Sequence, residues 1–486
     1  MMTWAAVAFL VLGFLAFLRL FKLVPRGLEA IALSKRSLAI VRDDSLDLEI
    51  KEQELQKNSL HMLRLFVILT GGAAVALLLP YGAVWLVDRA GWVSIDDVMA
   101  RAVSMPVLIG GSLLTLLALF SGKKGECNES SYSGLDRCVH RIAFHTVPAQ
   151  IAIADGEDAM FRKRLEQVST DRPVFITGLP RAGTTLVLEC CAGLQDMASH
   201  CYRDMPYVLT PCLWDQLSQP FRKNLEKRQR AHGDGMEIDL DSPEALEEAI
   251  WMPFWKEQYQ ADRIQTWPVK EHSEFKEFFQ HHMRKIVWLR SQAGTARSRY
   301  LSKNNLNIAR IPWLRQHFPD SIILVPFRDP LQHVGSLLHQ HQRFQQMHKE
   351  DKFSRDYMKA IGHFDFGENL KPVDFDGWLA QREERDATQP AFWLDYWIAT
   401  YEHLLATYEA QNIAFIDFET LCKDPERSLV KLSEVIETQH PDQLQELASG
   451  IRIPKQRDLE SSLTSESQAY DLHNRLRAVA INKPPR

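Results

Sequence analysis

A short apolar segment that runs directly into a glycine-spaced turn constrains this chain more than any other feature. Residues 173–178 read Pro-Val-Phe-Ile-Thr-Gly, which is typical of a buried strand. The turn Gly178-Leu-Pro-Arg-Ala-Gly-Thr-Thr185 follows and leads into a helix-forming run. In such a unit, backbone N–H groups and the helix dipole converge on a phosphate. A plain turn could carry the same glycines, but the flanking strand and helix favour a nucleotide-binding α/β fold.

The residues inside this turn differ from those of nucleoside triphosphatases. Their pattern, GxxxxGK[ST], has a lysine that reaches the β- and γ-phosphates. Here Thr184 stands in place of that lysine, and the positive charge lies within the turn as Arg181. A guanidinium can bind phosphate or sulfonate oxygens through two hydrogen bonds. The turn therefore disfavours transfer of a γ-phosphate.

The turn resembles the Pro-[Lys/Arg]-x-Gly-Thr-Thr loop of the sulfotransferase family. In that family the loop binds the 5′-phosphosulfate of 3′-phosphoadenosine 5′-phosphosulfate (PAPS), the sulfonate donor. The resemblance implies donor binding by the matching residues, which are Pro180, Arg181, Ala182, Gly183, Thr184 and Thr185.

A second motif strengthens the resemblance. Residues 321–327 are an apolar, β-rich run, followed by Arg328-Asp-Pro-Leu-Gln-His-Val-Gly-Ser336. The family places an arginine at the end of such a strand and a serine eight residues later, and both bind the 3′-phosphate of the donor. Arg328 and Ser336 have this spacing, while Asp329 and Pro330 also predict a helix start. A weaker similarity covers residues 415–425, which resemble a late strand of the family followed by a helix that a proline starts. We expect a strand from about residue 412 and a structural role for this segment.

A cation and a base are needed for sulfonate transfer to an acceptor. Residues 300–305 read as a strand that ends in a polar turn, and this turn resembles the Lys-x-His element of cytosolic sulfotransferases. The register implies that Lys303 contacts the sulfonate and that Asn305 replaces the histidine base. A surface lysine is the alternative for Lys303. An asparagine is no useful base near neutral pH, so the expected base is missing.

Three carboxylates are candidates for that base. Asp204 lies close to the position of a glutamate in the glycan and protein-tyrosine branches of the family. Glu247 and Glu248 are the alternatives, although residues 242–244 also predict the capped start of a helix there. The sequence does not decide among the three, and Arg181 is the further candidate for a catalytic role. An aromatic group at residues 251–259 could line an acceptor pocket, but its helical spacing is more typical of a core.

Three apolar segments near the N-terminus predict a membrane anchor over residues 1–124, followed by a sulfotransferase domain over residues 125–486. The predicted spans are residues 4–24, 65–87 and 103–120, and a long helix is expected over residues 28–60. The loop after the first span is rich in basic residues: Arg26, Lys35, Arg36, Arg42, Lys51 and Lys57. This distribution predicts an integral membrane protein of a bacterial inner membrane, with the main domain in the cytoplasm.

Composition excludes several other classes. A net charge of −5 argues against nucleic-acid binding. The seven cysteines show no CxxC pair, and no metal-binding motif is present, so we expect no metal; His339 and His341 are expected to be solvated. The sequence gives no indication of the oligomeric state.

These features together predict a three-layer α/β, P-loop-like domain with a largely parallel central sheet, preceded by transmembrane helices. The expected reaction moves a sulfonate from PAPS to a hydroxyl or amine of a glycan, lipid or other acceptor near the membrane. A membrane-bound P-loop kinase or triphosphatase is one alternative. A non-catalytic membrane protein that retains a nucleotide-binding fold is the other.

Overall fold

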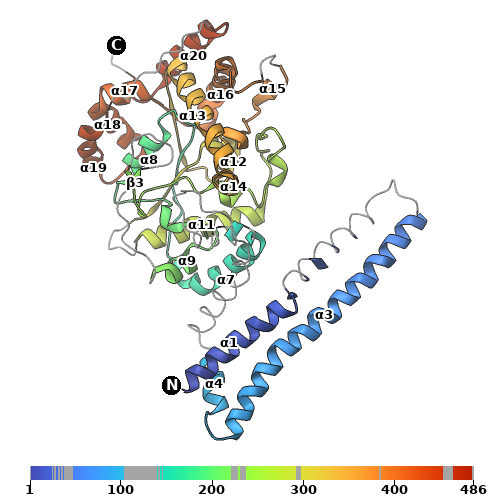
Figure 1. The fold of residues 1–486 in the computed structure, drawn as a ribbon. Coiled ribbons are helices and arrows are strands. Elements are labelled where there is room, and N and C mark those ends of the chain that lie inside the picture. Colours follow the sequence, from blue (N-terminus) through green and yellow to red (C-terminus); the bar gives the residue numbers. More distant parts are fainter. Residues whose placement is uncertain are drawn as a thin grey trace. The chain divides into compact units, whose positions relative to one another are not determined.

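The computed structural model contains two compact units, residues 1–134 and 135–486 (Figure 1). Apart from a few short pieces between them, the residues that the structure describes are 2–23, 48–102, 146–219, 237–291, 297–381, 385–452 and 463–483.

The first unit is helical. Helix α1 spans Met2–Leu20, α3 spans Leu48–Arg89 and α4 spans Ile95–Ala102. In Figure 1, α1 and α3 lie side by side, and Val7, Val84 and Val98 form a small buried cluster among the three helices.

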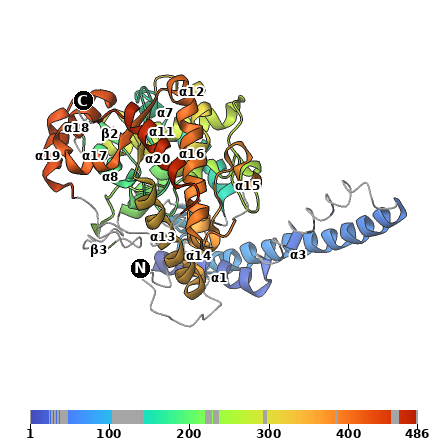
Figure 2. The same cartoon turned by 90° about the horizontal axis from the view of Figure 1, so that it is seen from above.

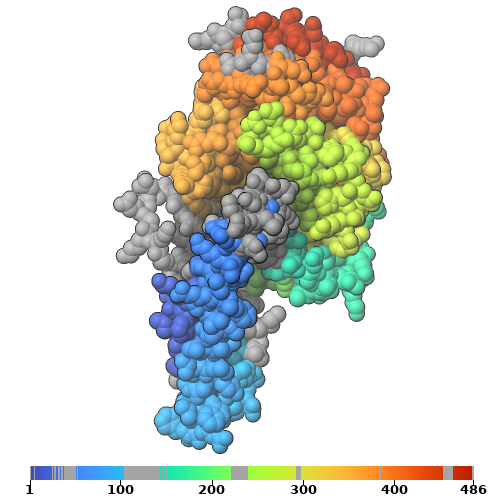
Figure 3. Space-filling model, turned by 90° about the vertical axis from the view of Figure 1, so that its right-hand side faces the viewer, coloured from blue at the N-terminus to red at the C-terminus, as the bar shows by residue number. Residues whose placement is uncertain are grey.

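Most of the apolar surface of α3 is exposed (blue in Figure 3), including Leu63, Phe66 and Leu78. The segments Met2–Leu20 and Gln53–Arg89 are long and apolar enough to cross a membrane. A long helix is expected from the sequence over residues 28–60. The structure has a continuous helix from Leu48 onward, and this helix includes the second predicted span. The predicted third span, residues 103–120, lies outside the described residues.

The second unit is built on a five-stranded parallel sheet in the order β2-β5-β1-β6-β7. The strands are β1 (Val174–Ile176), β2 (Met197–Ala198), β5 (Arg299–Lys303), β6 (Ile322–Phe327) and β7 (Ile413–Asp417). A separate antiparallel pair joins β3 (Arg228–Gln229) and β4 (Glu237–Ile238). The four longer strands of the parallel sheet lie where the apolar runs predict them. Strand β2, with two residues, is too short to show the alternation that identifies a strand.

Alternate strand residues enter two separate cores, because successive side chains of a strand point to opposite faces. In β1, Phe175 belongs to one core, while Val174 and Ile176 belong to the other. In β6, Val325 and Leu324 divide in the same way. The predicted three-layer α/β fold is therefore confirmed.

Helices cover both faces of this sheet. On one side lie α8 (Thr184–Ala192), α17 (Phe418–Lys423), α18 (Pro425–Ile436) and α19 (Pro441–Glu446). The other core receives side chains of α11 (Ser273–Ser291), α12 (Ile311–His317), α13 (Pro330–Glu350), α16 (Pro390–Gln411) and α20 (Glu466–Val479). Figures 1 and 2 both show α18 and α19 on the side of the sheet opposite to α12 and α16.

Further helices and turns complete the described part of the unit. The other α-helices in this part are α7 (Val147–Leu165), α9 (Pro211–Ser218), α10 (Glu248–Trp251), α14 (Lys352–Ala360) and α15 (Trp378–Gln381). The 3-10 turns are η1 (Tyr202–Asp204), η3 (Lys256–Gln258), η4 (Asn305–Ala309), η5 (Gly367–Asn369), η6 (Phe375–Gly377) and η7 (Leu447–Gly450).

The expected helix start at residues 242–244 is wrong. Ser242 instead closes a turn, in which its Oγ bonds the backbone N–H and the carboxylate of Asp239. Pro243 pairs with Cys201 in an isolated bridge, so the backbone there is extended and the helix begins only at Glu248. The aromatic residues that follow are core: Trp251 and Trp255 are fully buried.

A buried ion pair lies beneath this core. Arg310 has no exposed surface, and its guanidinium lies 4.2 Å from the ring centroids of both Trp251 and Trp267. Its Nη2 donates to Glu248 Oε2 at 2.5 Å. Because both charges are removed from water, loss of either partner would leave a buried unpaired charge and strongly lower the stability of the fold.

We expect Arg310→Met to destabilise the protein by about 3–5 kcal/mol, because Glu248 would be left buried without its cation. The measurement is unfolding of the full chain in detergent, followed by tryptophan fluorescence. The matched control is Arg355→Met, which removes a partly exposed arginine that pairs with Asp356 and Glu368. Equal stability of the two variants would contradict a structural role for the buried pair.

Candidate functional site

The turn after β1 adopts the backbone conformation that its glycines allow. Gly178 and Gly183 have φ values of +141° and +101°, and Arg181 has a φ of +70°. A non-glycine residue in the left-handed region is uncommon and is often found at functional sites. A Cβ on Gly183 would lie 2.3 Å from the Phe418 ring, so a side chain at this position has no room.

Helix α8 begins at Thr184, directly after the turn. The first N–H groups of a helix have no partner within the helix, and its dipole is positive at that end. The turn and the start of α8 can therefore bind an anion, as the sequence predicts.

The structure brings the two sequence motifs together. Arg181 Nε donates to Ser336 Oγ at 3.3 Å, although 155 positions separate the two residues. Beside this contact, the buried His333 donates from Nε2 to the carbonyl oxygen of Pro180 at 2.8 Å. Because β1 and β6 are parallel neighbours, the turns that follow them meet at the same edge of the sheet.

Arg328 follows directly after β6. Its side chain is 9% exposed, its Cζ lies 5.3 Å from the ring centroid of Phe418, and its Nε lies 3.5 Å from Glu419 Oε1. The next residue, Asp329, caps α13 by accepting a hydrogen bond from Gln332 N at 3.0 Å, as the sequence predicts. Ser336 lies about two turns along α13 from this cap and is buried.

Sequence reasoning missed the contribution of residues 415–425 to this region. Phe418 packs against both Gly183 and Arg328, and Glu419 accepts a hydrogen bond from the backbone N–H of Asp329 at 3.1 Å. These contacts agree with the expected structural role and place it at the edge of the candidate site. Nothing in the local sequence indicates this proximity, because it results from the pairing of β6 with β7.

Strand β5 supplies the third group of residues. Lys303 is its last residue, is half-buried, and is in register with Ile176 of β1. Two positions later, Asn305 Oδ1 lies 3.4 Å from Thr184 Oγ1, so this amide reaches the nucleotide turn. The amide Nδ2 donates to Asp365 Oδ2 at 2.9 Å. Asp365 lies in a segment that the sequence did not single out.

Glu247 and Glu248 are placed close to β5 but are occupied by other partners. Glu247 accepts hydrogen bonds from Tyr300, Asn307 and Trp251 at 3.0–3.1 Å. Glu248 accepts from Arg310, from Asn304 at 2.7 Å, and from Tyr259. Both carboxylates are buried, so these contacts favour a structural role over that of a base.

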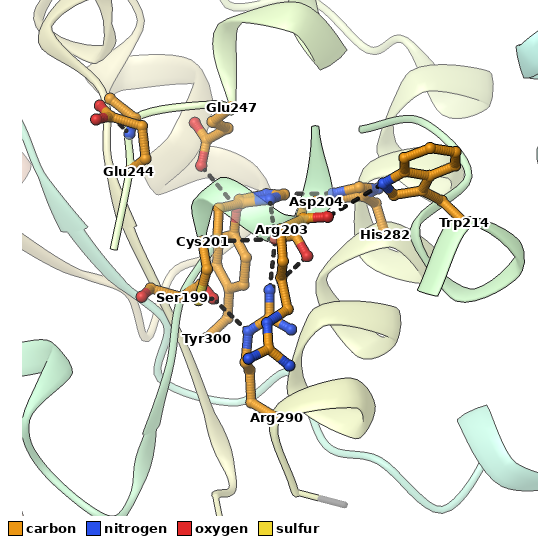
Figure 4. A network of polar contacts seen from close by, with 12 residues as sticks. Ser199, Cys201, Arg203, Asp204, Trp214, Glu244, Glu247, His282, Arg290 and Tyr300 are labelled. Atoms are coloured by element: carbon orange, nitrogen blue, oxygen red, sulfur yellow. Dashed lines mark hydrogen bonds and ion pairs between the residues drawn. The ribbon is translucent and has the colours of Figure 1, made fainter. Parts of the chain in front are cut away.

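The third candidate base, Asp204, lies in the polar network that Figure 4 shows, which also includes Glu247. Both of its carboxylate oxygens lie 2.5 Å from Arg290 Nη2, and one accepts from the backbone N–H of Cys201 at 2.9 Å. Burial opposes ionisation, but Arg290 and His200 outweigh it and hold the pKa of Asp204 well below its usual range. A carboxylate with a lowered pKa is a weak base, so the structure disfavours the role considered for Asp204.

The histidines of α13 differ from the sequence expectation in one respect. His339 is exposed, but His341 is buried, and its Nδ1 accepts from the backbone N–H of Gly367 at 3.2 Å. The reason is that the face of α13 that carries His341 packs against α16 and η5. Within the described part of the chain, no group of three or more His, Cys, Asp or Glu side chains could hold a metal ion.

The chain is similar to a known protein family and to two solved structures. Residues 173–442 match the model of the sulfotransferase family, and this range contains both motifs. The chain is similar to the solved structure of sulfotransferase STF9 from Mycobacterium avium, with 14% identity, a TM-score of 0.37, and coverage of 75% of this chain and 94% of that one. It is also similar to the solved structure of sulfotransferase STF1 from Mycobacterium tuberculosis, with 13% identity, a TM-score of 0.36, and coverage of 75% of this chain and 91% of that one. No curated protein matches the sequence.

We expect Glu419 to make anion binding at Arg328 dependent on pH. Burial, reinforced by Asp417, raises the pKa of Glu419 to about 7, although Asp329 N–H and Arg328 oppose the rise. Below that pH the carboxyl group is mostly neutral, and above it a negative charge faces any anion bound at Arg328. Lys423, Arg427, His473 and Arg477 line the adjacent cavity.

At pH 8, we expect the wild-type protein to bind adenosine 3′,5′-bisphosphate about three- to tenfold more weakly than a Glu419→Gln variant does. At pH 6, the two proteins should bind it with nearly equal affinity. The variant is the reference because phosphate groups themselves ionise near pH 6. Isothermal titration calorimetry at both pH values measures the difference. A ratio that does not change with pH would show that Glu419 does not face the bound anion.

Proposed function

Because the chain belongs to the sulfotransferase family, we propose that it transfers a sulfonate group from PAPS to a hydroxyl or amine of an acceptor near the membrane. The observation that carries this proposal is the hydrogen bond from Arg181 to Ser336. It joins the turn that the resemblance assigns to the 5′-phosphosulfate with the helix assigned to the 3′-phosphate. A donor with phosphates at both positions of its ribose would match both sets of groups.

The residues around the turn provide what the chemistry needs. Sulfonate transfer resembles phosphoryl transfer, in which positioning and charge stabilisation supply most of the catalysis. Arg181 and the start of α8 provide positive charge and N–H donors for the 5′ end of the donor. Lys303, at the end of the neighbouring strand, supplies a second cation for the charge that develops on the leaving oxygen. Arg328 and Ser336 hold the 3′-phosphate, and this scheme needs no metal.

The same residues weigh against the two alternatives. A kinase or triphosphatase needs a cation where this chain has Thr184, whose hydroxyl lies 3.4 Å from Asn305 Oδ1. A non-catalytic protein would have no requirement for the close packing of Gly183 on Phe418 or for the hydrogen bond from Arg181 to Ser336. A preference for ATP over adenosine 3′,5′-bisphosphate would distinguish a kinase or triphosphatase from the proposed sulfotransferase. Turnover of PAPS would distinguish the proposed enzyme from a non-catalytic protein.

The first unit supports our proposals for the acceptor and the location. Helices α1 and α3 have the length and composition of membrane spans, and the basic residues lie between them. A third span, predicted from the sequence at residues 103–120, would return the chain to the side of this basic loop, so we propose that the second unit lies on the cytoplasmic side of a bacterial inner membrane. A glycan or lipid at the membrane surface is the acceptor class that suits this location.

We expect full-length protein in detergent to bind adenosine 3′,5′-bisphosphate, and Arg328→Ala to weaken binding about 10- to 100-fold, the value of a hydrogen bond to a charged group. Calorimetric titration measures both. The control Arg355→Ala removes a partly exposed arginine of α14 and should bind like wild type. Magnesium-ATP should not displace the ligand. Preference for magnesium-ATP would contradict the proposal in favour of a kinase.

The orientation has its own test. A green fluorescent protein fused after Arg486 should fluoresce in a bacterial host, and alkaline phosphatase fused at the same position should be inactive, because each reporter matures on one side of the membrane. The opposite result would place the second unit outside the cytoplasm and overturn the location proposed here.

A further inference from the structure

The proposed reaction lacks a base among the residues that sequence reasoning selected. Asn305 cannot accept a proton usefully near neutral pH. The carboxylates of Asp204, Glu247 and Glu248 are at most 3% exposed, and each accepts hydrogen bonds from several protein groups. An acceptor hydroxyl group therefore has poor access to all three.

Asp365 differs from these carboxylates in both position and access. Its side chain is 13% exposed, so one part of the carboxylate can meet a substrate. Its Oδ2 accepts from Asn305 Nδ2 at 2.9 Å, and the Oδ1 of the same amide lies 3.4 Å from Thr184 Oγ1. Two consecutive contacts thus connect Asp365 to the nucleotide turn.

The segment that carries Asp365 is held in place at both ends. It joins α14 to η5 and contains Gly362 and Gly367, with φ values of +81° and +68°. A Cβ on Gly362 would lie 2.3 Å from Glu248 Cγ, and one on Gly367 would lie 2.6 Å from His348 Nδ1. Each glycine therefore lets the backbone pack closely against a buried side chain.

The four side chains between these two glycines differ in burial. Phe364 and Phe366 are buried in the main core, whereas His363 and Asp365 are only partly buried. The ring of His363 stacks on Phe344 at a centroid distance of 5.3 Å, and its Nε2 lies 3.9 Å from Asp365 Oδ2. The packing of both phenylalanines fixes the direction in which the carboxylate points.

We propose that Asp365 is the general base of the sulfonate transfer and that Asn305 positions its carboxylate. The inference rests on the function proposed above. Asp365 takes the proton of the acceptor O–H or N–H group while the acceptor atom forms a bond to sulfur. The bond between sulfur and the bridging phosphate oxygen breaks, and its electron pair leaves with adenosine 3′,5′-bisphosphate. The carboxyl group then returns its proton to water.

The test uses full-length protein in detergent and two readouts. Binding of adenosine 3′,5′-bisphosphate reports on the donor site. Release of labelled sulfate from [³⁵S]PAPS, with water as the acceptor, together with transfer to octyl β-glucoside, reports on the chemical step. We expect Asp365→Asn to lower turnover about 100-fold or more, the usual contribution of a general base, with the binding constant unchanged within twofold. Asp365→Glu should recover part of the turnover.

The matched control is Asp356→Asn, which removes an exposed carboxylate of α14 and should retain wild-type turnover. If Asp365→Asn binds the nucleotide and retains turnover within threefold of wild type, the inference is overturned while the proposed function stands. If wild-type protein does not bind the nucleotide, or binds it without releasing sulfate, both are overturned.

A double-mutant cycle tests the positioning role of Asn305. Asn305→Ala should lower turnover in the wild-type background and have little further effect in Asp365→Asn, because it acts through the carboxylate. Equal losses in both backgrounds would mean that Asn305 acts on the nucleotide turn alone, and would remove it from the proposal.

Discussion

The parallel pairing of β1 with β5 on one side and β6 on the other is the constraint on which the candidate site depends. Parallel strands end at the same edge of a sheet, so the segments that follow the three strands share one crevice. The hydrogen bond from Arg181 to Ser336 and the approach of Asn305 to Thr184 are both consequences of this pairing. A strand order that separated β1 from either neighbour would disperse these residues over the sheet.

A buried polar network fixes the third of these segments. Glu247 and Glu248 bond the end of β5 and the following 3-10 turn through Tyr300, Asn304 and Asn307. Buried carboxylates are costly unless their hydrogen bonds are satisfied, and here Arg310 and several donors satisfy them. The network explains why Glu247 and Glu248, which lie close to the end of β5, are suited to a structural role and unsuited to proton transfer.

Two glycines allow other segments to pack closely around the nucleotide turn and the buried network. Gly183 admits the Phe418 ring, and Gly362 admits Glu248, which brings the segment containing Asp365 against the buried network. In both places a missing Cβ allows the close approach of a segment that is remote in sequence. The missing Cβ atoms of Gly183 and Gly362 therefore help to position both the nucleotide turn and the segment that contains Asp365.

The sequence by itself determined the nucleotide turn, the four longer strands of the parallel sheet, the helix cap at Asp329 and the apolar character of the first unit. Each of these depends on neighbours in the chain, because strand alternation, caps and turns are local properties. Only the tertiary structure decided which carboxylates are buried in ion pairs, as Asp204 is with Arg290, and which remain accessible, as Asp365 does. Burial and pairing depend on contacts between residues that are distant in sequence, which one sequence does not reveal.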